Sequence, residues 1–242
     1  MEISIDIAAV RRLIRTEHSQ ACVEIEARGP VAALAASQLR HDERLAGAAD
    51  ADTLACKDGC SWCCHFTVDV RAAEAFRIVD FVTGHFSPQQ RAALQQEVFA
   101  NSAEVAKLSE IERMQRTVKC PFLDGGRCTI YAVRPQTCRN YHATDSAGCR
   151  QSFEQPQNMD IDPEFAPLVY QAGGAHIEAF SKAMAEAGYD VAAYELNMAL
   201  GAVWRQPEAR LRFEAKQKPF TSVAGEDVPS EFMDDDEDEE DR

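Results

Sequence analysis

The sequence predicts a mainly α-helical domain interrupted by two irregular, cysteine-rich loops. Apolar residues recur at helical spacing over most of the chain, and glycine or proline marks the ends of these stretches. We find no internal repeat and no alternation of strand and helix patterns of the kind that builds a parallel sheet. Eight of the nine cysteines fall instead in two stretches without periodicity. With 242 residues and 45% apolar content, the chain can form a sizeable core without metal or disulfide staples.

The N-terminal part is expected to form a helical pair. A helix is predicted over residues 6–25, where apolar side chains repeat every three or four positions, and Gly29-Pro30 ends it. A second helix, rich in alanine and leucine, is predicted over residues 31–45. Cys22 lies near the apolar stripe of the first helix and has no cysteine neighbour, so we expect it to be a core thiol.

The first loop holds four cysteines in nine residues, spaced C-x3-C-x2-C-C: Cys56, Cys60, Cys63 and Cys64, with His65 directly after. A free cysteine packs as a small hydrophobe, but so short a stretch cannot point four side chains into one core. The four thiols therefore either form disulfides or hold metal.

Two further helices separate this loop from the second one. The first is predicted over residues 70–82 and stops near Gly84. The next is predicted over residues 88–116, because Ser87 and Pro88 have the chemistry of a helix cap and a first helical residue. This pair is expected to return the chain to the first loop.

The second loop contributes the four remaining members of the cysteine set: Cys120, Cys128, Cys138 and Cys149. Eight cysteines make two sets of four, and four thiolates suit either a structural zinc or an iron–sulfur cluster. The side chains of adjacent Cys63 and Cys64 diverge on an extended backbone, so they should serve different metals or different atoms of one cluster. We therefore expect the loops to converge on a metal site, with several sulfurs within about 4 Å of one another.

The charge of the second loop supports this interpretation. From Lys119 to Arg150 there are five basic and two acidic residues, although the whole chain carries a net charge of −15. Four thiolates around a divalent ion carry about −2, and nearby guanidinium groups would offset that charge.

The C-terminal third is again helical. Helices are predicted over residues 162–187, from Asp190 onward to include Val203, and over residues 207–216. His176 falls on an apolar face of the first of these, so we expect a core histidine rather than a ligand.

The expected domain organisation is a single helical domain over residues 1–220, with the cysteine module at about 54–150, and a disordered acidic tail over 221–242. Residues 226–242 contain eleven acidic residues and one arginine, so they carry ten of the fifteen net negative charges. This balance disfavours nucleic acid and anionic membranes as partners. The sequence identifies no protein partner.

The expected location is the cytoplasm. The N-terminus lacks a basic segment followed by an apolar one, and no apolar run approaches the roughly 18 residues of a membrane span. Cytoplasmic thiols are kept reduced, which favours metal or redox chemistry over a disulfide framework.

The cysteine pattern resembles the YkgJ-like CxxCxxCC cysteine-cluster family, described as a zinc- or iron-chelating domain. The match rests on the first loop, on Cys120-Pro-Phe-Leu, and on the segment Cys128-Thr-Ile-Tyr-x2-Arg-Pro-x2-Cys138-Arg-x-Tyr141. It covers roughly residues 54–150, and Cys149 lies outside its strongest part. Three residues rather than two separate Cys56 from Cys60, a departure from many members. A related group of cysteines occurs in flagellin lysine methylases, which hold an iron–sulfur cluster. For this chain the resemblance implies metal binding but no named reaction.

The favoured hypothesis is a protein that chelates zinc or iron, including iron held as an iron–sulfur cluster, in a structural or metal-handling role. One alternative is an iron–sulfur redox or protein-modifying enzyme related to those methylases, and another is a thiol redox sensor using Cys63 and Cys64. The spacing of the first three cysteines also occurs in radical S-adenosylmethionine enzymes, but the barrel of strands and helices that they require is not predicted here. No catalytic residues can be assigned, and no phosphate loop or dinucleotide fingerprint is found.

Overall fold

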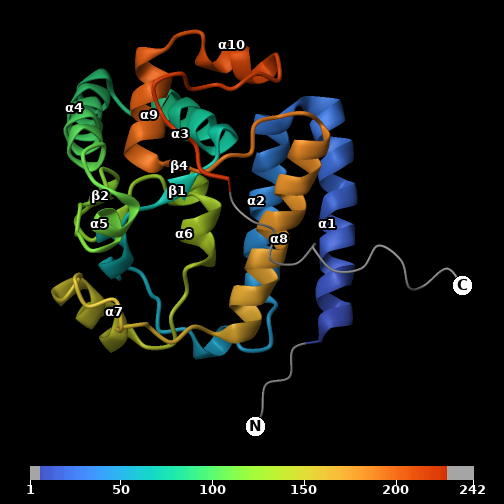
Figure 1. Ribbon diagram of the computed structural model, residues 1–242. Coiled ribbons are helices and arrows are strands. Elements are labelled where there is room, and N and C mark those ends of the chain that lie inside the picture. The colour runs from blue at the N-terminus through green and yellow to red at the C-terminus, as the bar shows by residue number, and fades with distance from the viewer. Residues whose placement is uncertain (1–5, 228–242) are drawn as a thin grey trace, which may run out of the picture.

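The computed structural model describes residues 6–227 and confirms a mainly helical fold (Figure 1). Over these residues the α-helices are α1 (Ile7–Arg28), α2 (Pro30–Ala46), α3 (Ala72–His85), α4 (Pro88–Val105), α5 (Glu110–Met114), α6 (Gln136–Asn140), α7 (Ser146–Glu154), α8 (Pro167–Glu186), α9 (Leu196–Arg205) and α10 (Ala209–Glu214). The strands form two antiparallel pairs of two residues each, β1 (Asp69–Val70) with β4 (Tyr194–Glu195) and β2 (Leu123–Asp124) with β3 (Arg127–Cys128). None of the helices described is long and apolar enough to cross a membrane.

Helices α1, α2 and α8 form one side of the molecule, where α8 packs along both N-terminal helices (Figure 1). The break between α1 and α2 falls at Gly29, whose φ of 76° lies in the left-handed region that favours glycine. Pro30 follows as the first residue of α2, a position where its missing N–H leaves no hydrogen bond unmade. The predicted helical pair is confirmed.

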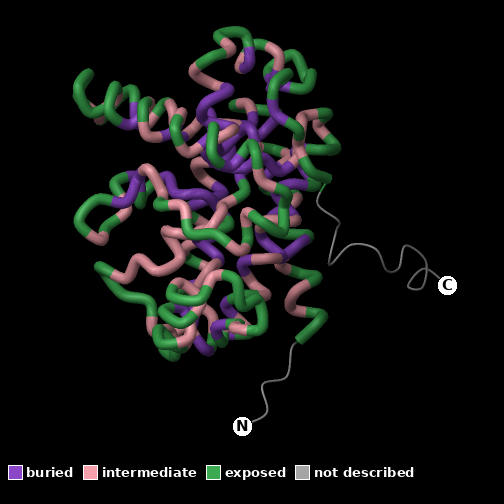
Figure 2. The backbone as a smooth tube through the Cα atoms, turned by 60° about the vertical axis from the view of Figure 1, so that its left-hand side comes forward, coloured by how far each residue is buried: buried purple, intermediate pink, exposed green. Residues whose placement is uncertain are grey.

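Helices α3, α4, α9 and α10 form the other side, and the main hydrophobic core lies among them and extends toward α2 and α8. Phe76 of α3 is fully buried and packs against Phe213 of α10 and against Phe220, with ring centroids 5.3 and 6.0 Å away. Buried backbone runs through the middle of the molecule, and exposed segments lie along its rim (Figure 2).

The helix predicted over residues 88–116 is wrong in its second half. Helix α4 ends at Val105, and Ser109 begins the separate helix α5 by accepting a hydrogen bond from the Glu112 N–H at 3.3 Å. The Glu112 side chain accepts one from the Ser109 N–H at 2.8 Å, completing a reciprocal cap. The apolar periodicity alone predicts one continuous helix, but the local capping signal at Ser109 starts a second one.

The helix predicted to begin at Asp190 begins six residues later, at Leu196. Tyr194 and Glu195 are extended because they pair with Val70 and Asp69 of β1. The Glu195 side chain then caps α9 by accepting the Met198 N–H at 2.9 Å. A pairing between distant segments overrides the local helical pattern.

The expected tail boundary at residue 221 also needs correction. Phe220 and Val223 are buried, and Glu226 exchanges backbone hydrogen bonds of 2.8 and 2.9 Å with Ala193. The Glu226 carboxylate also pairs with Arg113 of α5 at 2.8 Å. Residues 221–227 are thus part of the folded domain, whereas the rest of the expected tail, 228–242, lies outside the described residues.

A buried charged cluster joins α1, α2 and α8. The Glu17 carboxylate is fully buried and accepts hydrogen bonds from Arg40 at 2.8 Å, Arg44 at 2.6 Å and Ser37 at 2.9 Å. His176 of α8 lies 2.9 Å from the same Ser37 hydroxyl, which confirms its expected place in the core. Because each charge has a partner, removing one member would leave the others unpaired in the interior.

His41 of α2 stacks on His176, with ring centroids 4.7 Å apart. Burial lowers the pKa of both to about 2, assisted by His176 in the case of His41 and by Arg44 in the case of His176. Both histidines are therefore neutral in the folded protein at ordinary pH.

We expect the free energy of unfolding to fall as the pH drops below about 6.5, because the unfolded chain then protonates both histidines and the native state does not. The two histidines together contribute up to about 2.7 kcal/mol per pH unit of slope, and His176→Gln should remove about half of that. Urea unfolding between pH 4 and 8 measures this slope. An identical slope in the variant would contradict the assignment.

Candidate metal centre

The two cysteine-rich loops lie side by side, as predicted, because their backbones are paired. The Cys120 N–H donates to the Cys64 carbonyl at 2.8 Å, and the Val118 N–H donates to the His65 carbonyl at 2.9 Å. These bonds join the segment that enters the second loop to the 3₁₀ helix η2 (Trp62–His65) of the first. They bring Cys64 and Cys120 together from opposite ends of the helical pair α3–α4.

The β2–β3 hairpin rests against the first loop. Gly125 and Gly126 form its turn with φ of 54° and 80°, the pair of positive angles that a two-residue type I′ turn requires. A Cβ on Gly126 would lie 3.5 Å from the Gly59 carbonyl oxygen, so the two turns are in close contact. Beside them Arg127 and Asp58 form an ion pair at 2.7 Å, which further ties the loops together.

Cys120 and Cys128, on either side of this hairpin, have matching local environments. The Phe122 N–H lowers the pKa of the Cys120 thiol, and the Ile130 N–H lowers that of the Cys128 thiol, each against the larger effect of burial. Each donor lies two residues after its cysteine. An N–H directed at sulfur favours the thiolate, which is the form that binds metal.

One set of four thiols gathers around these two: Cys64, Cys120, Cys128 and Cys138. Burial raises the pKa of Cys138 well above its usual value, and the neighbouring Cys120, Cys64 and Cys128 raise it further. Burial also raises the pKa of Cys120 to about 12, opposed by the Phe122 N–H and assisted by Cys64 and Cys128. We call these four residues the inner set.

The other four cysteines form what we call the outer set: Cys56, Cys60, Cys63 and Cys149. Burial, assisted by the charges of Cys56 and Cys60, raises the pKa of Cys149 to about 11. Cys149 is buried on α7, whereas Cys56 is exposed. The Cys56 thiol points toward the Ala143 carbonyl oxygen, 3.9 Å away, and the Ala55 N–H donates to the same carbonyl at 2.9 Å.

The two sets meet at adjacent Cys63 and Cys64. The two thiols act on each other: Cys63 lowers the pKa of Cys64 to about 7, and Cys64, with burial, raises that of Cys63 far above its usual value. The charges of Cys138 and Cys56 raise the pKa of Cys63 as well. Both residues lie in the 3₁₀ helix η2, so the extended backbone from which their divergence was predicted is wrong, and the two sets meet where these two thiols act on each other.

The expected sulfur spacing is not met. No three cysteine sulfurs in residues 6–227 lie within 4.8 Å of one another, whereas sulfurs about 2.3 Å from a shared tetrahedral zinc are separated by roughly 3.8 Å. The donor set nevertheless suits zinc or iron, since thiols of both loops lie near enough to raise one another's pKa and thiolates bind either metal. Binding at either set would therefore need side-chain rotations that draw the sulfurs together.

Aromatic residues cover the outer set. Phe153 of α7 packs against Trp62 and His65, with ring centroids 5.3 and 4.7 Å away. Tyr141 lies beside Cys149, Cys63 and Cys56, and burial together with these thiols raises its pKa. Phe153 could not be predicted from the sequence, because only the folded chain brings α7 over the first loop.

Buried charges hold Cys138 in place through its neighbour Arg139. The Arg139 guanidinium is 1% exposed, pairs with Asp42 of α2 and donates to the carbonyls of Ala132 and Arg134 at 2.7 and 3.1 Å. These bonds fix helix α6, and with it the Cys138 backbone, against α2. Neither Asp42 nor this role of Arg139 was predicted, since an Arg–Asp pair separated by 97 positions leaves no local signal.

Helix α6 is also fixed at its other end and along its side. The Gln136 N–H donates to buried Glu74 of α3 at 2.7 Å. Gly173 of α8 leaves room for the Asn140 side chain, since a Cβ there would fall 1.8 Å from Asn140 Oδ1. Three helices therefore position the cysteine in α6.

Two histidines, His65 and His142, lie close to the cysteines in the sequence but differ in their surroundings. His65 faces Phe153, and burial followed by the charge of Lys119 lowers its pKa. His142 has a lowered pKa too, chiefly from burial, and its Nδ1 is buried without a hydrogen-bond partner.

Comparison with known proteins supports the metal-binding interpretation. Residues 55–160 match the family model CxxCxxCC, described as "Putative zinc- or iron-chelating domain". The match begins one residue before Cys56 and extends past α7, so it includes all eight cysteines of the two sets. No curated protein and no solved structure gives a significant match. The resemblance inferred from the cysteine spacing is confirmed, since residues 55–160 match the model of this zinc- or iron-chelating family.

Proposed function

We propose that this protein binds zinc or iron through two neighbouring thiolate sites, one formed by the inner set and one by the outer set. The observation that carries this proposal is the backbone pairing of the loops at Cys64 and Cys120, which brings thiols of both loops near Cys138. Four thiolates per set is the ligand number that zinc and iron–sulfur clusters share.

The electrostatics of the inner set favour a cation. Burial raises the thiol pKa values, so four neighbouring thiolates without a positive charge between them would be costly. A divalent ion reverses this balance, because metal coordination deprotonates thiols outright. Arg134 and Arg139 also lower the pKa of Cys128, opposing the effect of burial, and would offset the charge left on a four-thiolate centre.

The two sets suit different roles. The inner set joins loops that contain little regular structure, so a metal there would act as a structural cross-link. The outer set includes exposed Cys56, which gives solvent and exchange partners access to it. We infer a structural inner site and an exchangeable outer site, as a metal-handling protein requires.

An iron–sulfur enzyme or a redox sensor is the alternative. The lowered pKa of Cys64, about 7, favours thiol reactivity at this position and is the observation that supports a sensor. Visible absorption after anaerobic purification distinguishes bound zinc from an iron–sulfur cluster, since zinc is colourless and iron–sulfur clusters absorb visible light.

Replacing one cysteine of either set should reduce the metal content by the share of that set's site. Cys138→Ser should abolish binding at the inner site, and Cys149→Ser should lower the content by the share of the outer site, because each removes one of four thiolates. Elemental analysis of zinc, iron and sulfide measures both. Ser61→Ala, between Cys60 and Cys63 and without a thiol, is the control and should keep the full content. Unchanged content in both cysteine variants would refute the assignment.

Removing the metal should destabilise the fold. At about 1,000 times its dissociation constant a bound ion stabilises by about 4 kcal/mol, or about 8–16 °C in melting temperature for a domain of this size. Calorimetry before and after chelation measures this shift. Recovery of the original melting temperature when the metal is added back is the control for irreversible damage to the protein. An unchanged melting temperature after chelation, in protein shown to have lost its metal, would rule out the structural role.

A further inference from the structure

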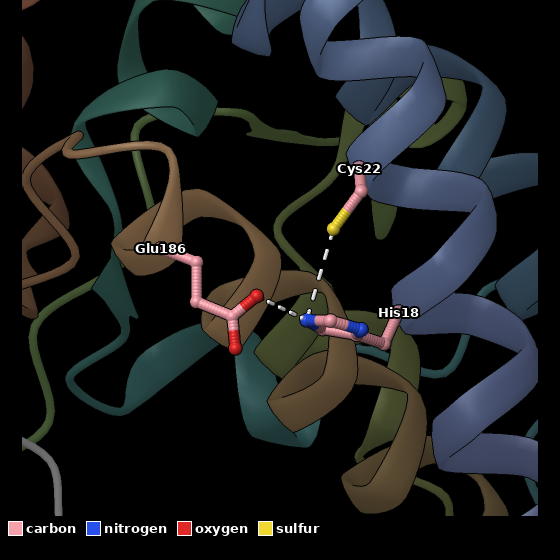
Figure 3. Close-up of side chains that lie close together, drawn as sticks. All are labelled: His18, Cys22 and Glu186. Atoms are coloured by element: carbon pink, nitrogen blue, oxygen red, sulfur yellow. Dashed lines mark hydrogen bonds and ion pairs between the residues drawn. The ribbon is translucent and has the colours of Figure 1, made fainter.

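Three potential metal ligands meet at a second place, on the side of the molecule formed by α1 and α8 (Figure 3). His18 and Cys22 lie four positions apart on α1, which places them on one face of the helix. Glu186 is the last residue of α8. One ligand atom from each of the three lies within 4.8 Å of the other two, and no other group of three His, Cys, Asp or Glu residues in the described part of the chain meets that limit.

Both partners of His18 approach the same ring nitrogen. Its Nε2 is 2.7 Å from Glu186 Oε2 and 3.7 Å from Cys22 Sγ. A catalytic relay would use the two ring nitrogens separately, one for the acid and one for the nucleophile. Convergence on one nitrogen is instead the arrangement of groups around a shared cation, which would take the place of the Nε2 proton.

The spacing is close to that of a zinc site. With zinc about 2.0–2.1 Å from nitrogen and oxygen and about 2.3 Å from sulfur, tetrahedral ligand atoms lie roughly 3.3–3.6 Å apart. The Cys22–His18 distance of 3.7 Å is already of this size. The Glu186 carboxylate would have to withdraw by roughly 0.6 Å. It can do so because its side chain is 49% exposed and free to rotate.

The surroundings also suit a divalent ion. Cys22 packs at the edge of the hydrophobic core, while Glu186 faces solvent, so the site is anchored on one side and open on the other. Within residues 6–227, Glu186 forms no ion pair with lysine or arginine. One thiolate and one carboxylate would neutralise a divalent cation, and neutral histidine would supply the third bond.

We propose that His18, Cys22 and Glu186 bind one zinc ion, with solvent in the fourth position. Binding displaces the Cys22 thiol proton to solvent and requires the imidazole proton to reside on Nδ1. The site is separate from the eight-cysteine centre, since α8 contacts α1 on one side and α6 on the other (Figure 1). Three protein ligands and an open position are typical of an accessible zinc site rather than a closed structural one.

The test follows the alkylation of Cys22 in the full chain carrying its resident metal, resolved by peptide mass spectrometry. Zinc added at increasing concentration should slow labelling of Cys22 at least about tenfold, because a coordinated thiolate is not free to react. Magnesium should give no protection, since it prefers oxygen ligands.

Two variants make the test specific. Losing even an outer-shell partner costs a metal site about ten- to a hundredfold in affinity, so His18→Gln and Glu186→Gln should each raise the zinc concentration needed for protection at least about tenfold. His85→Gln, at an exposed histidine of α3, is the control and should leave the protection unchanged. Melting curves verify that the variants are folded. Labelling that zinc does not slow, or protection that survives both His18→Gln and Glu186→Gln, would overturn the proposal.

Discussion

The Cys120 N–H to Cys64 C=O hydrogen bond is the contact on which the eight-cysteine centre depends. It joins two loops separated in sequence by helices α3 and α4, and it brings thiols from both into the inner set. The adjacent Cys63 then extends the arrangement toward Cys56, Cys60 and Cys149. Without this pairing Cys64 of the first loop would not lie beside Cys120 of the second.

The helical body supports this centre through buried polar contacts rather than through close apolar packing alone. Arg139 and Asp42 connect Cys138 to α2, and Glu74 connects the same helix to α3. Burying a polar group without its partner is costly, whereas a buried network in which every group has its partner is rigid. They explain why a mainly helical protein can keep irregular cysteine loops in defined positions.

Much of this architecture could be predicted from the sequence because its causes are local. Apolar periodicity and Gly29-Pro30 located the first helices, and the cysteine spacing identified the domain family and the convergence of the loops. The end of α4, the late start of α9 and the packing of Phe153 over Trp62 could not be predicted in this way. They depend on a competing cap, on pairing with β1 and on a distant helix, and these causes are absent from a local window.

The sulfur spacing lies beyond sequence reasoning as well, because it depends on side-chain rotations within the paired loops. X-ray absorption at the metal edge, on protein dialysed free of weakly bound ions, shows whether thiolates hold the metal. We expect a first shell made only of sulfur, about four atoms at about 2.3 Å per metal for zinc. A first shell dominated by nitrogen and oxygen, or full metal content in a chain lacking Cys64 and Cys120, would contradict it.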